Sequence, residues 1–338
     1  MRKSIIQRIV LVTISLFLTL LVMELALRIH RGRQNSVGRM AYHSRLGWIP
    51  RPGQFGSDWT SNVDDSNLRS SGRSVSTTSR PILAIGDSFT FGDEGEDSEA
   101  WTALLENTLN KRVLNAGVGA YGIDQAYLRA ELLLEQYNPD VVILSFISDD
   151  INRTELSYYP YGGGWKPYFE YEDGSLVLRN VPVPRAPPPQ GSHSFQTLRN
   201  GLSYSALADF VLNRIAGKWW RDLPVKQIHQ DGENVSVDLL VRMNALTKGH
   251  GGQFIAVAFA TNGSIGNNAR LPNLVERLRE KDIEVLNLLP EMLKLQPSQL
   301  QKLFQPGGHY SPAGNRWVGE RIAAFLDERG IRSPPSSP

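Results

Sequence analysis

Residues 82–92 of the chain, ILAIGDSFTFG, join a short apolar run to a turn that carries glycine, aspartate and serine. A short apolar run bounded by a turn is typical of a buried strand. In an open parallel sheet, ligands gather outside the carboxyl ends of the strands. Ser88 directly follows this strand and is therefore well placed to meet a ligand.

Apolar runs and helical patterns alternate along much of the chain. Further apolar runs begin at Val113 and Val141, and two more occupy residues 254–260 and 283–288. Strand, helix, strand at a period of about thirty residues is typical of βαβ units, which form a parallel sheet with right-handed crossovers. We therefore predict an α/β domain with a central parallel sheet over residues 81–330, followed by a disordered tail at 331–338.

The alternation is interrupted between residues 153 and 234. This stretch contains YYPYGGGW at 158–165, the run VPVPRAPPP at 181–189, and a helical pattern that ends near Trp219 and Trp220. Proline cannot pair into the interior of a sheet, so we predict an inserted loop or lid rather than a separate domain. Its aromatic clusters could stack on sugar rings, although lid packing or contact with a membrane surface is the more usual role.

The N-terminus has the pattern of a membrane anchor. Three basic residues precede an apolar run at 9–27 whose one charged residue is Glu24. A run of this length spans a bilayer core as a helix, and no small-residue cleavage site follows it. We predict an uncleaved single-pass signal anchor with a cytoplasmic tip in residues 1–30, and a linker with a small N-terminal element in 31–80. A buried amphipathic helix is the alternative, and the flanking arginines leave the orientation open.

Composition excludes several kinds of site. The chain has 338 residues, a net charge of +2 and no cysteine. Disulfides, thiolate nucleophiles and cysteine-ligated zinc are therefore excluded. The basic residues are dispersed, so we expect no nucleic-acid partner. The six histidines lack HExxH or similar spacing, and we expect no metal and no cofactor.

Ser88 requires a base, because a serine hydroxyl is a weak nucleophile. The flanking glycines allow a sharp turn and let a substrate approach the backbone. We assign Asp87 a structural role, accepting N–H groups within the turn. An ordinary strand-to-helix turn is the alternative interpretation, because Gly, Asp and Ser are common in such turns.

Four segments in order resemble the blocks of the SGNH (GDSL) hydrolases. The blocks are 86–92 (GDSFTFG), 115–125 (NAGVGAYGIDQ), 145–151 (SFISDDI) and 307–315 (GGHYSPAGN), matching blocks I, II, III and V. An anchor followed by Leu46-Gly47-Trp48 also resembles the bacterial membrane-tethered members. The resemblance covers residues 82–326 and implies a three-layer, flavodoxin-like α/β fold in addition to the N-terminal transmembrane helix.

The resemblance also implies roles for single residues. Ser88 matches the nucleophile and His309 the general base. The backbone N–H of Ser88 is one expected oxyanion donor. Alignment on block II places Ala120 at the second donor, where the family has glycine, with Gly119 beside it.

Two positions depart from the family pattern. Asp149 stands where block III supplies an Asn donor, and a carboxylate repels a developing oxyanion unless it is protonated. Residues 305–308 (QPGG) contain no acid where the family places an Asp before the histidine. Loss of such an oxyanion donor costs about 10²-fold to 10³-fold in rate, and loss of the triad acid about 10⁴-fold. A backbone carbonyl could orient His309 instead, which would leave a Ser–His dyad.

The sequence therefore predicts a serine esterase or deacylase that acts on ester-linked acyl groups. The anchor points to acylated glycans or lipids of the cell envelope as substrates, and to a catalytic domain outside the cytoplasm, periplasmic or at the cell surface. Two alternatives stay open. One is a non-catalytic binding protein with the SGNH fold, and the other is an O-acyltransferase of a cell-surface polysaccharide, which would use the same residues.

Overall fold

A computed structural model describes residues 2–34, 39–56, 60–73, 79–160, 162–185, 202, 205–216, 226–261 and 270–331. The chain divides into two units, one formed by residues 1–38 and 188–224, the other by residues 39–187 and 225–338. The proline-rich run beyond residue 185, the Trp219-Trp220 pair and the predicted tail from residue 332 onward lie outside the described residues.

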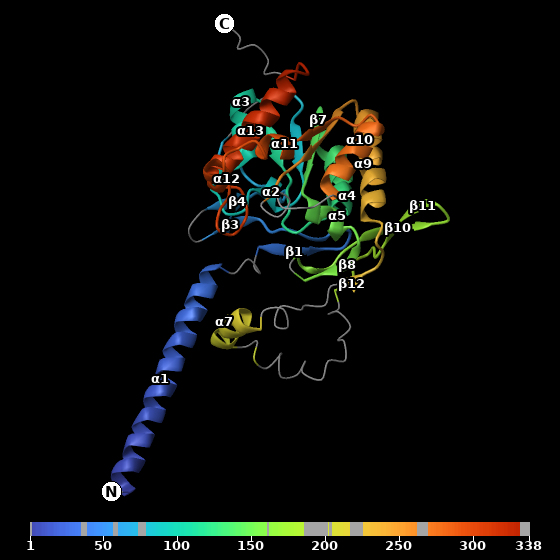
Figure 1. Ribbon diagram of the computed structural model, residues 1–338. Helices are drawn as coiled ribbons and strands as arrows, with labels where there is room; N and C mark the ends of the chain where they lie inside the picture. Colours follow the sequence, from blue (N-terminus) through green and yellow to red (C-terminus); the bar gives the residue numbers. More distant parts are fainter. Residues whose placement is uncertain are drawn as a thin grey trace. The chain divides into compact units, whose positions relative to one another are not determined.

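A five-stranded parallel sheet forms the centre of the larger unit (Figure 1). Its order is β14-β13-β7-β5-β6, and every neighbouring pair is parallel. The strands are β5 (Ile82–Ile85), β6 (Val113–Asn115), β7 (Val141–Phe146), β13 (Gln253–Ala258) and β14 (Val285–Asn287). Each of the five apolar runs in the sequence forms one strand, which confirms the predicted α/β fold with a central parallel sheet.

The main helices lie in two layers, one on each face of the sheet (Figure 1). In one layer α3 (Trp101–Leu109) packs with α13 (Pro312–Asp327); in the other α9 (Gly232–Gly249) packs with α4 (Ile123–Tyr137) and α10 (Arg270–Glu280). The chain steps from β5 to β6 in one direction, and from there to β7, β13 and β14 in the other. The carboxyl end of β5 therefore lies at the point of reversal, where open α/β sheets bind ligands.

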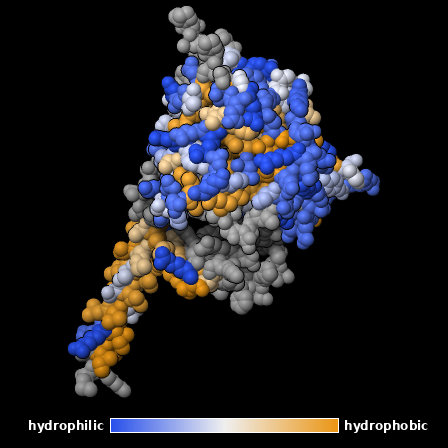
Figure 2. All heavy atoms as spheres, turned by 45° about the horizontal axis from the view of Figure 1, so that its top comes forward, coloured by the Kyte–Doolittle hydropathy of each residue, from blue (hydrophilic) through white to orange (hydrophobic). Residues whose placement is uncertain are grey.

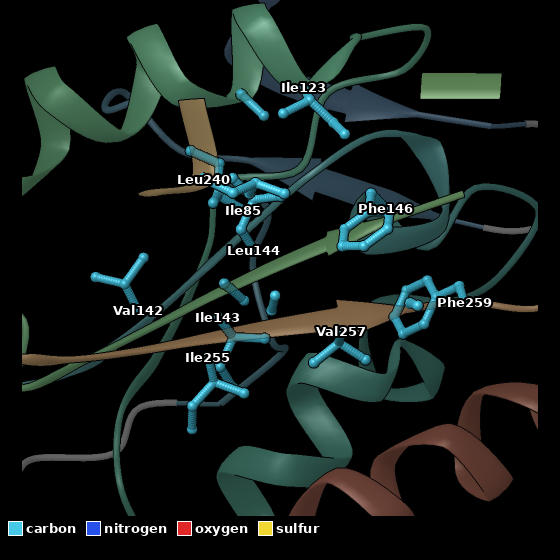
Figure 3. Close-up of a cluster of buried hydrophobic side chains, with 14 of the residues drawn as sticks. Ile85, Ile123, Val142, Ile143, Leu144, Phe146, Leu240, Ile255, Val257 and Phe259 are labelled. Carbon is cyan, nitrogen blue, oxygen red and sulfur yellow. The ribbon is translucent and has the colours of Figure 1, made fainter. Parts of the chain in front are cut away.

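The strands are buried on both faces and build the hydrophobic core. Every residue of β5 and β7 is buried. Figure 3 shows side chains of three neighbouring strands, among them Ile85, Leu144 and Val257, in one cluster. Full burial of one aliphatic side chain stabilises a fold by about 1.5–3 kcal/mol, so the continuous apolar runs hold the sheet and the loops at its carboxyl edge. Short helices complete this unit: α2 (Ser88–Phe91), the 3-10 helix η2 (Asp97–Glu99), α5 (Ser148–Arg153), α11 (Leu289–Met292) and α12 (Pro297–Lys302).

Two hairpins precede the sheet in the sequence. They are β1 (Met40–His43) with β2 (Gly47–Pro50), and β3 (Gly53–Phe55) with β4 (Ser61–Val63). Leu46 and Trp48 of the first hairpin are buried in the core of the larger unit. The first hairpin is therefore part of the packed structure around the sheet.

The interruption after β7 contains five short strands. They are β8 (Leu156–Tyr159), β9 (Gly164–Trp165), β10 (Tyr168–Glu172), β11 (Ser175–Arg179) and β12 (Lys226–Gln227), which form one sheet in the order β12-β8-β9 and one β10-β11 hairpin. Lys166, between β9 and β10, pairs with Asp124 of α4, and both side chains are fully buried. Burial lowers the pKa of Lys166 and raises that of Asp124, while their mutual attraction opposes both shifts. This pair fastens the inserted strands to the main domain.

Replacing Lys166 with methionine is expected to lower the free energy of unfolding by about 3–5 kcal/mol, because the Asp124 carboxylate would remain buried without its partner. Denaturant unfolding followed by circular dichroism measures the loss. The matched control is Arg45→Met in the more exposed Arg45–Glu131 pair, where the two side chains are 41% and 28% exposed. Solvent weakens that pair, so its removal should cost less. Equal losses in the two variants would contradict the prediction.

The smaller unit contains α1 (Arg2–Gln34) and α7 (Ala206–Ile215). Within α1, the segment Ile5–Arg28 is long and apolar enough to cross a membrane, and Figure 2 shows hydrophobic side chains along the helix. Glu24 accepts hydrogen bonds from the Ser205 hydroxyl and from the first two N–H groups of α7. The one acid of the apolar run therefore caps the first turn of α7.

Candidate active site

Ser88 is the first residue of α2 and directly follows β5. The Asp87 side chain caps this short helix by accepting a hydrogen bond from the Phe89 N–H at 2.9 Å. Gly86 allows the close approach of the turn, because a Cβ there would lie 2.2 Å from the Thr90 hydroxyl oxygen. The turn thus places the Ser88 hydroxyl at the carboxyl edge of the sheet.

His309 lies in the loop between α12 and α13. Its Nε2 is 2.9 Å from the Ser88 hydroxyl oxygen, although the two residues are 221 positions apart. The imidazole packs against the Phe89 ring, which in turn meets the ring of Tyr310 edge-on. The Tyr310 hydroxyl donates to the Ala260 carbonyl at 2.7 Å. Aromatic packing therefore holds the imidazole in hydrogen-bond reach of the serine.

Glu94 faces the other ring nitrogen of His309. Its Oε1 lies 3.5 Å from Nδ1, and the two side chains are 31% and 25% exposed. His309 Nδ1 and Glu94 Oε2 are both buried atoms, and neither has a hydrogen-bond partner among the described residues. Gly307 leaves the space that the carboxylate occupies, because a Cβ there would lie 1.9 Å from Glu94 Oε1. A small approach of the two side chains would complete a Ser–His–Glu arrangement.

The loop that carries Glu94 is held by a buried arginine. The Arg69 guanidinium donates to the carbonyl oxygens of Phe91, Gly92 and Gly95, on both sides of Glu94. Glu94 itself has a left-handed backbone, with φ of 65°. A non-glycine residue rarely adopts this conformation unless its surroundings hold it there. Arg69 therefore keeps the loop in the shape that turns Glu94 toward His309.

Sequence reasoning does not find Glu94. The expected pattern directs the search to residues 305–308, whereas the carboxylate that lies 3.5 Å from His309 Nδ1 comes from the loop after Ser88. That loop, DEGED at 93–97, contains four acidic residues, and the sequence alone does not show which of them faces His309. Gly307 is the feature of the sequence that could have indicated Glu94. A glycine two residues before His309 leaves room beside the imidazole for a side chain from another loop.

Substituting Gly307 with alanine is expected to lower kcat about tenfold to a hundredfold, because the added methyl group displaces the Glu94 carboxylate and misplacement by about 1 Å has effects of this size. The rate of hydrolysis of a short aryl ester measures the change. Gly308→Ala is not a suitable control, since Gly308 has φ of 100°. Gly249→Ala is suitable, because open space surrounds that position. Unchanged kcat in Gly307→Ala would show that Glu94 need not occupy this place.

Backbone N–H groups are available for an oxyanion. The Ser88 N–H lies in the first turn of α2, where no intrahelical acceptor exists. Gly119 and Ala120 follow β6, and within the described part of the chain their N–H groups have no acceptor. Asp149 is exposed in the first turn of α5, and its side chain forms no hydrogen bond with any described residue. Among the described residues, the site therefore has backbone N–H groups without acceptors, while the Asp149 side chain forms no hydrogen bond with Ser88 or His309.

A network of buried charges holds the turn that carries Ser88. Arg153 Nη1 lies 2.5 Å from Asp150 Oδ1 and 3.3 Å from Asp87 Oδ2, and it donates to the Tyr121 carbonyl at 3.0 Å. Burial, reinforced by Asp87, raises the pKa of Asp150. Burial alone would lower the pKa of Arg153, but the two carboxylates outweigh it and raise the pKa. Asp87 is therefore bound by the Phe89 N–H on one side and by Arg153 on the other. Among the described residues, no group of three or more acidic or histidine side chains could hold a metal ion.

Among known proteins, this chain has similar solved structures but no similar sequence family. No family model matches the chain, and no curated protein sequence matches it. A lipase/acylhydrolase from Enterococcus faecalis is 16% identical and aligns over 77% of this chain and 100% of its own, with a TM-score of 0.42. A GDSL-like lipase from Bacteroides thetaiotaomicron VPI-5482 is 11% identical over 76% and 93%, with a TM-score of 0.41. An acetyl xylan esterase is 13% identical over 73% and 99%, with a TM-score of 0.42. At identities of 11–16% and TM-scores near 0.4, these neighbours do not define the chemistry of this site.

Proposed function

We propose that this chain is a serine hydrolase of ester bonds, with Ser88 as nucleophile and His309 as general base. One observation carries the proposal, the 2.9 Å separation between the Ser88 hydroxyl oxygen and His309 Nε2. Nucleophile and base in hydrogen-bond reach are the minimum that an activated serine requires. Glu94, 3.5 Å from Nδ1, is the group that orients the imidazole and stabilises its charged form.

The reaction follows from these positions. Ser88 Oγ attacks the ester carbonyl carbon while His309 Nε2 takes the hydroxyl proton. The oxyanion that forms accepts hydrogen bonds from the N–H groups of Ser88 and of the Gly119–Ala120 segment. His309 then returns the proton to the leaving alcohol. A water molecule, activated by His309, releases the acyl group as a carboxylic acid and restores Ser88.

Within this class, the chain is a deacylase of acylated glycans or lipids in the cell envelope. The apolar helix Ile5–Arg28 supports this substrate class, because it would tether the catalytic domain at a membrane surface. We place that domain outside the cytoplasm, periplasmic or cell-surface. Transfer of the acyl group to a polysaccharide hydroxyl uses the same residues, with the acceptor in place of water. Acyl transfer to added oligosaccharide, measured beside release of free acid, distinguishes the two reactions.

A fluorophosphonate probe tests the central proposal, because it labels activated serines. The full-length protein in detergent is expected to be labelled on the peptide that contains Ser88, as mapped by mass spectrometry. Ser88→Ala should abolish labelling, whereas Ser98→Ala, which changes an exposed serine outside the site, should retain it. Folded wild-type protein that takes no label would favour the non-catalytic binding protein, the candidate that the Asp149 substitution supports.

A further inference from the structure

The indole of Trp48 binds the backbone of the proposed oxyanion loop. Its Nε1 donates to the Gly119 carbonyl oxygen at 3.0 Å. We propose that Trp48 is a positioning residue that aims the Ala120 N–H at the developing oxyanion. The proposal rests on the proposed function, and it gives a role to the Leu46-Gly47-Trp48 segment that precedes the catalytic domain.

The argument begins with the peptide unit between Gly119 and Ala120. In a trans peptide the carbonyl oxygen and the following N–H point in opposite directions. The hydrogen bond from Trp48 to the Gly119 carbonyl therefore also sets the direction of the Ala120 N–H. That N–H has no acceptor in the described part of the chain, and Ala120 is half-buried.

The loop that contains this peptide packs against the nucleophile helix. A Cβ at Gly117 would lie 2.2 Å from the Phe91 nitrogen of α2, so this contact admits no side chain. The Val118 N–H donates to the Gly86 carbonyl at 3.0 Å, two residues before Ser88. The free N–H of Ala120 is thus carried by a loop that is joined to the serine turn on one side and to Trp48 on the other.

Ala120 has φ of 66°, a left-handed conformation that alanine rarely adopts. Such a conformation persists where neighbouring contacts hold it on several sides. Trp48 holds the preceding carbonyl. Tyr121, the following residue, donates through its hydroxyl to the Trp48 carbonyl at 2.5 Å and meets the indole edge-on at 5.8 Å between ring centroids. The unusual backbone at Ala120 is therefore held from both ends by one residue of the first hairpin.

Trp48 is itself held firmly. The side chain is buried, and Gly162 and Gly163 lie close against the ring. A Cβ would lie 2.1 Å from the ring at Gly162 and 3.1 Å from it at Gly163. The neighbouring Leu46 carbonyl accepts a hydrogen bond from the Gln125 side chain at 2.8 Å. The indole therefore has little freedom to turn, and a side chain that orients another group must be held rigidly in this way.

The orientation of this peptide matters more in this chain because Asp149 replaces the amide donor of block III. The oxyanion then depends on backbone N–H groups, and each donor contributes only if it is aimed at the position of the oxygen. A hydrogen bond that fixes one of these donors is therefore expected to affect the transition state more than the binding of substrate.

The test compares Trp48→Phe with incorporation of 3-benzothienylalanine at position 48, which keeps the ring shape and replaces the N–H by sulfur. In both, kcat for a short aryl ester should fall about tenfold to a hundredfold, less than full removal of a donor, with KM changed less than about twofold. Inhibition by an arylboronic acid, which forms a tetrahedral adduct with serine, should weaken by the same factor as kcat/KM.

The outcomes separate this proposal from the proposed function. If the folded wild-type protein shows no hydrolysis that depends on Ser88, the proposed function fails and the role of Trp48 fails with it. If wild type is active and the benzothienyl variant keeps its kcat within about twofold, the positioning role alone is overturned. A rise in KM at constant kcat would also overturn it, because that result assigns Trp48 to substrate binding.

Discussion

Ser88→Ala is expected to lower kcat for a short aryl ester on the order of 10⁵-fold to 10⁶-fold, the size seen when the nucleophile of a serine triad is removed. The variant loses the hydroxyl oxygen that lies 2.9 Å from His309 Nε2, so the imidazole has no hydroxyl proton to remove. The residual rate would come from water and the remaining backbone donors. Initial rates of p-nitrophenyl acetate hydrolysis by the full-length protein in detergent measure the effect.

The control for this variant is Ser98→Ala, an exposed serine at the start of the helical region that follows the nucleophile loop. It should retain the wild-type rate. Both variants should unfold near the wild-type temperature, because each change removes a single oxygen. A Ser88→Ala protein with undiminished hydrolysis would end the assignment of this site.

Glu94→Gln is expected to lower kcat by about 10³-fold to 10⁴-fold, close to the effect of replacing the acid in serine triads by its amide. The amide keeps the size of the side chain but loses the charge that stabilises the imidazolium as Ser88 gives up its proton. KM should change little, because Glu94 faces His309 Nδ1 and acts on the reaction through His309, not through contact with the substrate. Steady-state kinetics on the same ester separate kcat from KM.

Glu96→Gln is the matched control, since it changes a carboxylate in the same loop that is not paired with His309. The turn that follows is held by the Glu96 backbone, whose N–H donates to the Glu99 carboxylate at 3.0 Å and whose carbonyl accepts from the Glu99 N–H, so glutamine at position 96 leaves both bonds in place. The control should keep kcat within about twofold, as a surface carboxylate outside the site contributes little. Equal rates for Glu94→Gln and Glu96→Gln would leave His309 without an acid and point to a Ser–His dyad.

The two departures from the family pattern have different consequences in three dimensions. The acid that is missing from residues 305–308 has a counterpart in Glu94, for which Gly307 leaves space. Asp149 has no such counterpart among the described residues, and it stands exposed at α5. In the proposed mechanism, Glu94 from this loop supplies the acid, and backbone N–H groups supply the hydrogen bonds to the oxyanion.

Periodicity along the chain was enough to predict the five strands, the parallel sheet and the position of Ser88 after its first strand. These features are local, because a buried strand needs only a continuous apolar run and a turn needs only glycine and polar residues at fixed offsets. His309 could be singled out only by the resemblance of its surrounding residues to a family block. The bounds of the last two strands shifted by one or two residues, as at 254–260, where the strand is Gln253–Ala258.

By itself, the sequence determined the α/β fold, the order of its elements and the identity of a serine and a histidine that could react. Only the tertiary structure decided that Glu94 faces His309, that Arg69 holds the loop that carries Glu94, and that Trp48 binds the Gly119 carbonyl. The physical reason is that these contacts join loops that are far apart in the chain. Their geometry depends on how the helices and strands pack together, and it produces no periodic pattern in the sequence.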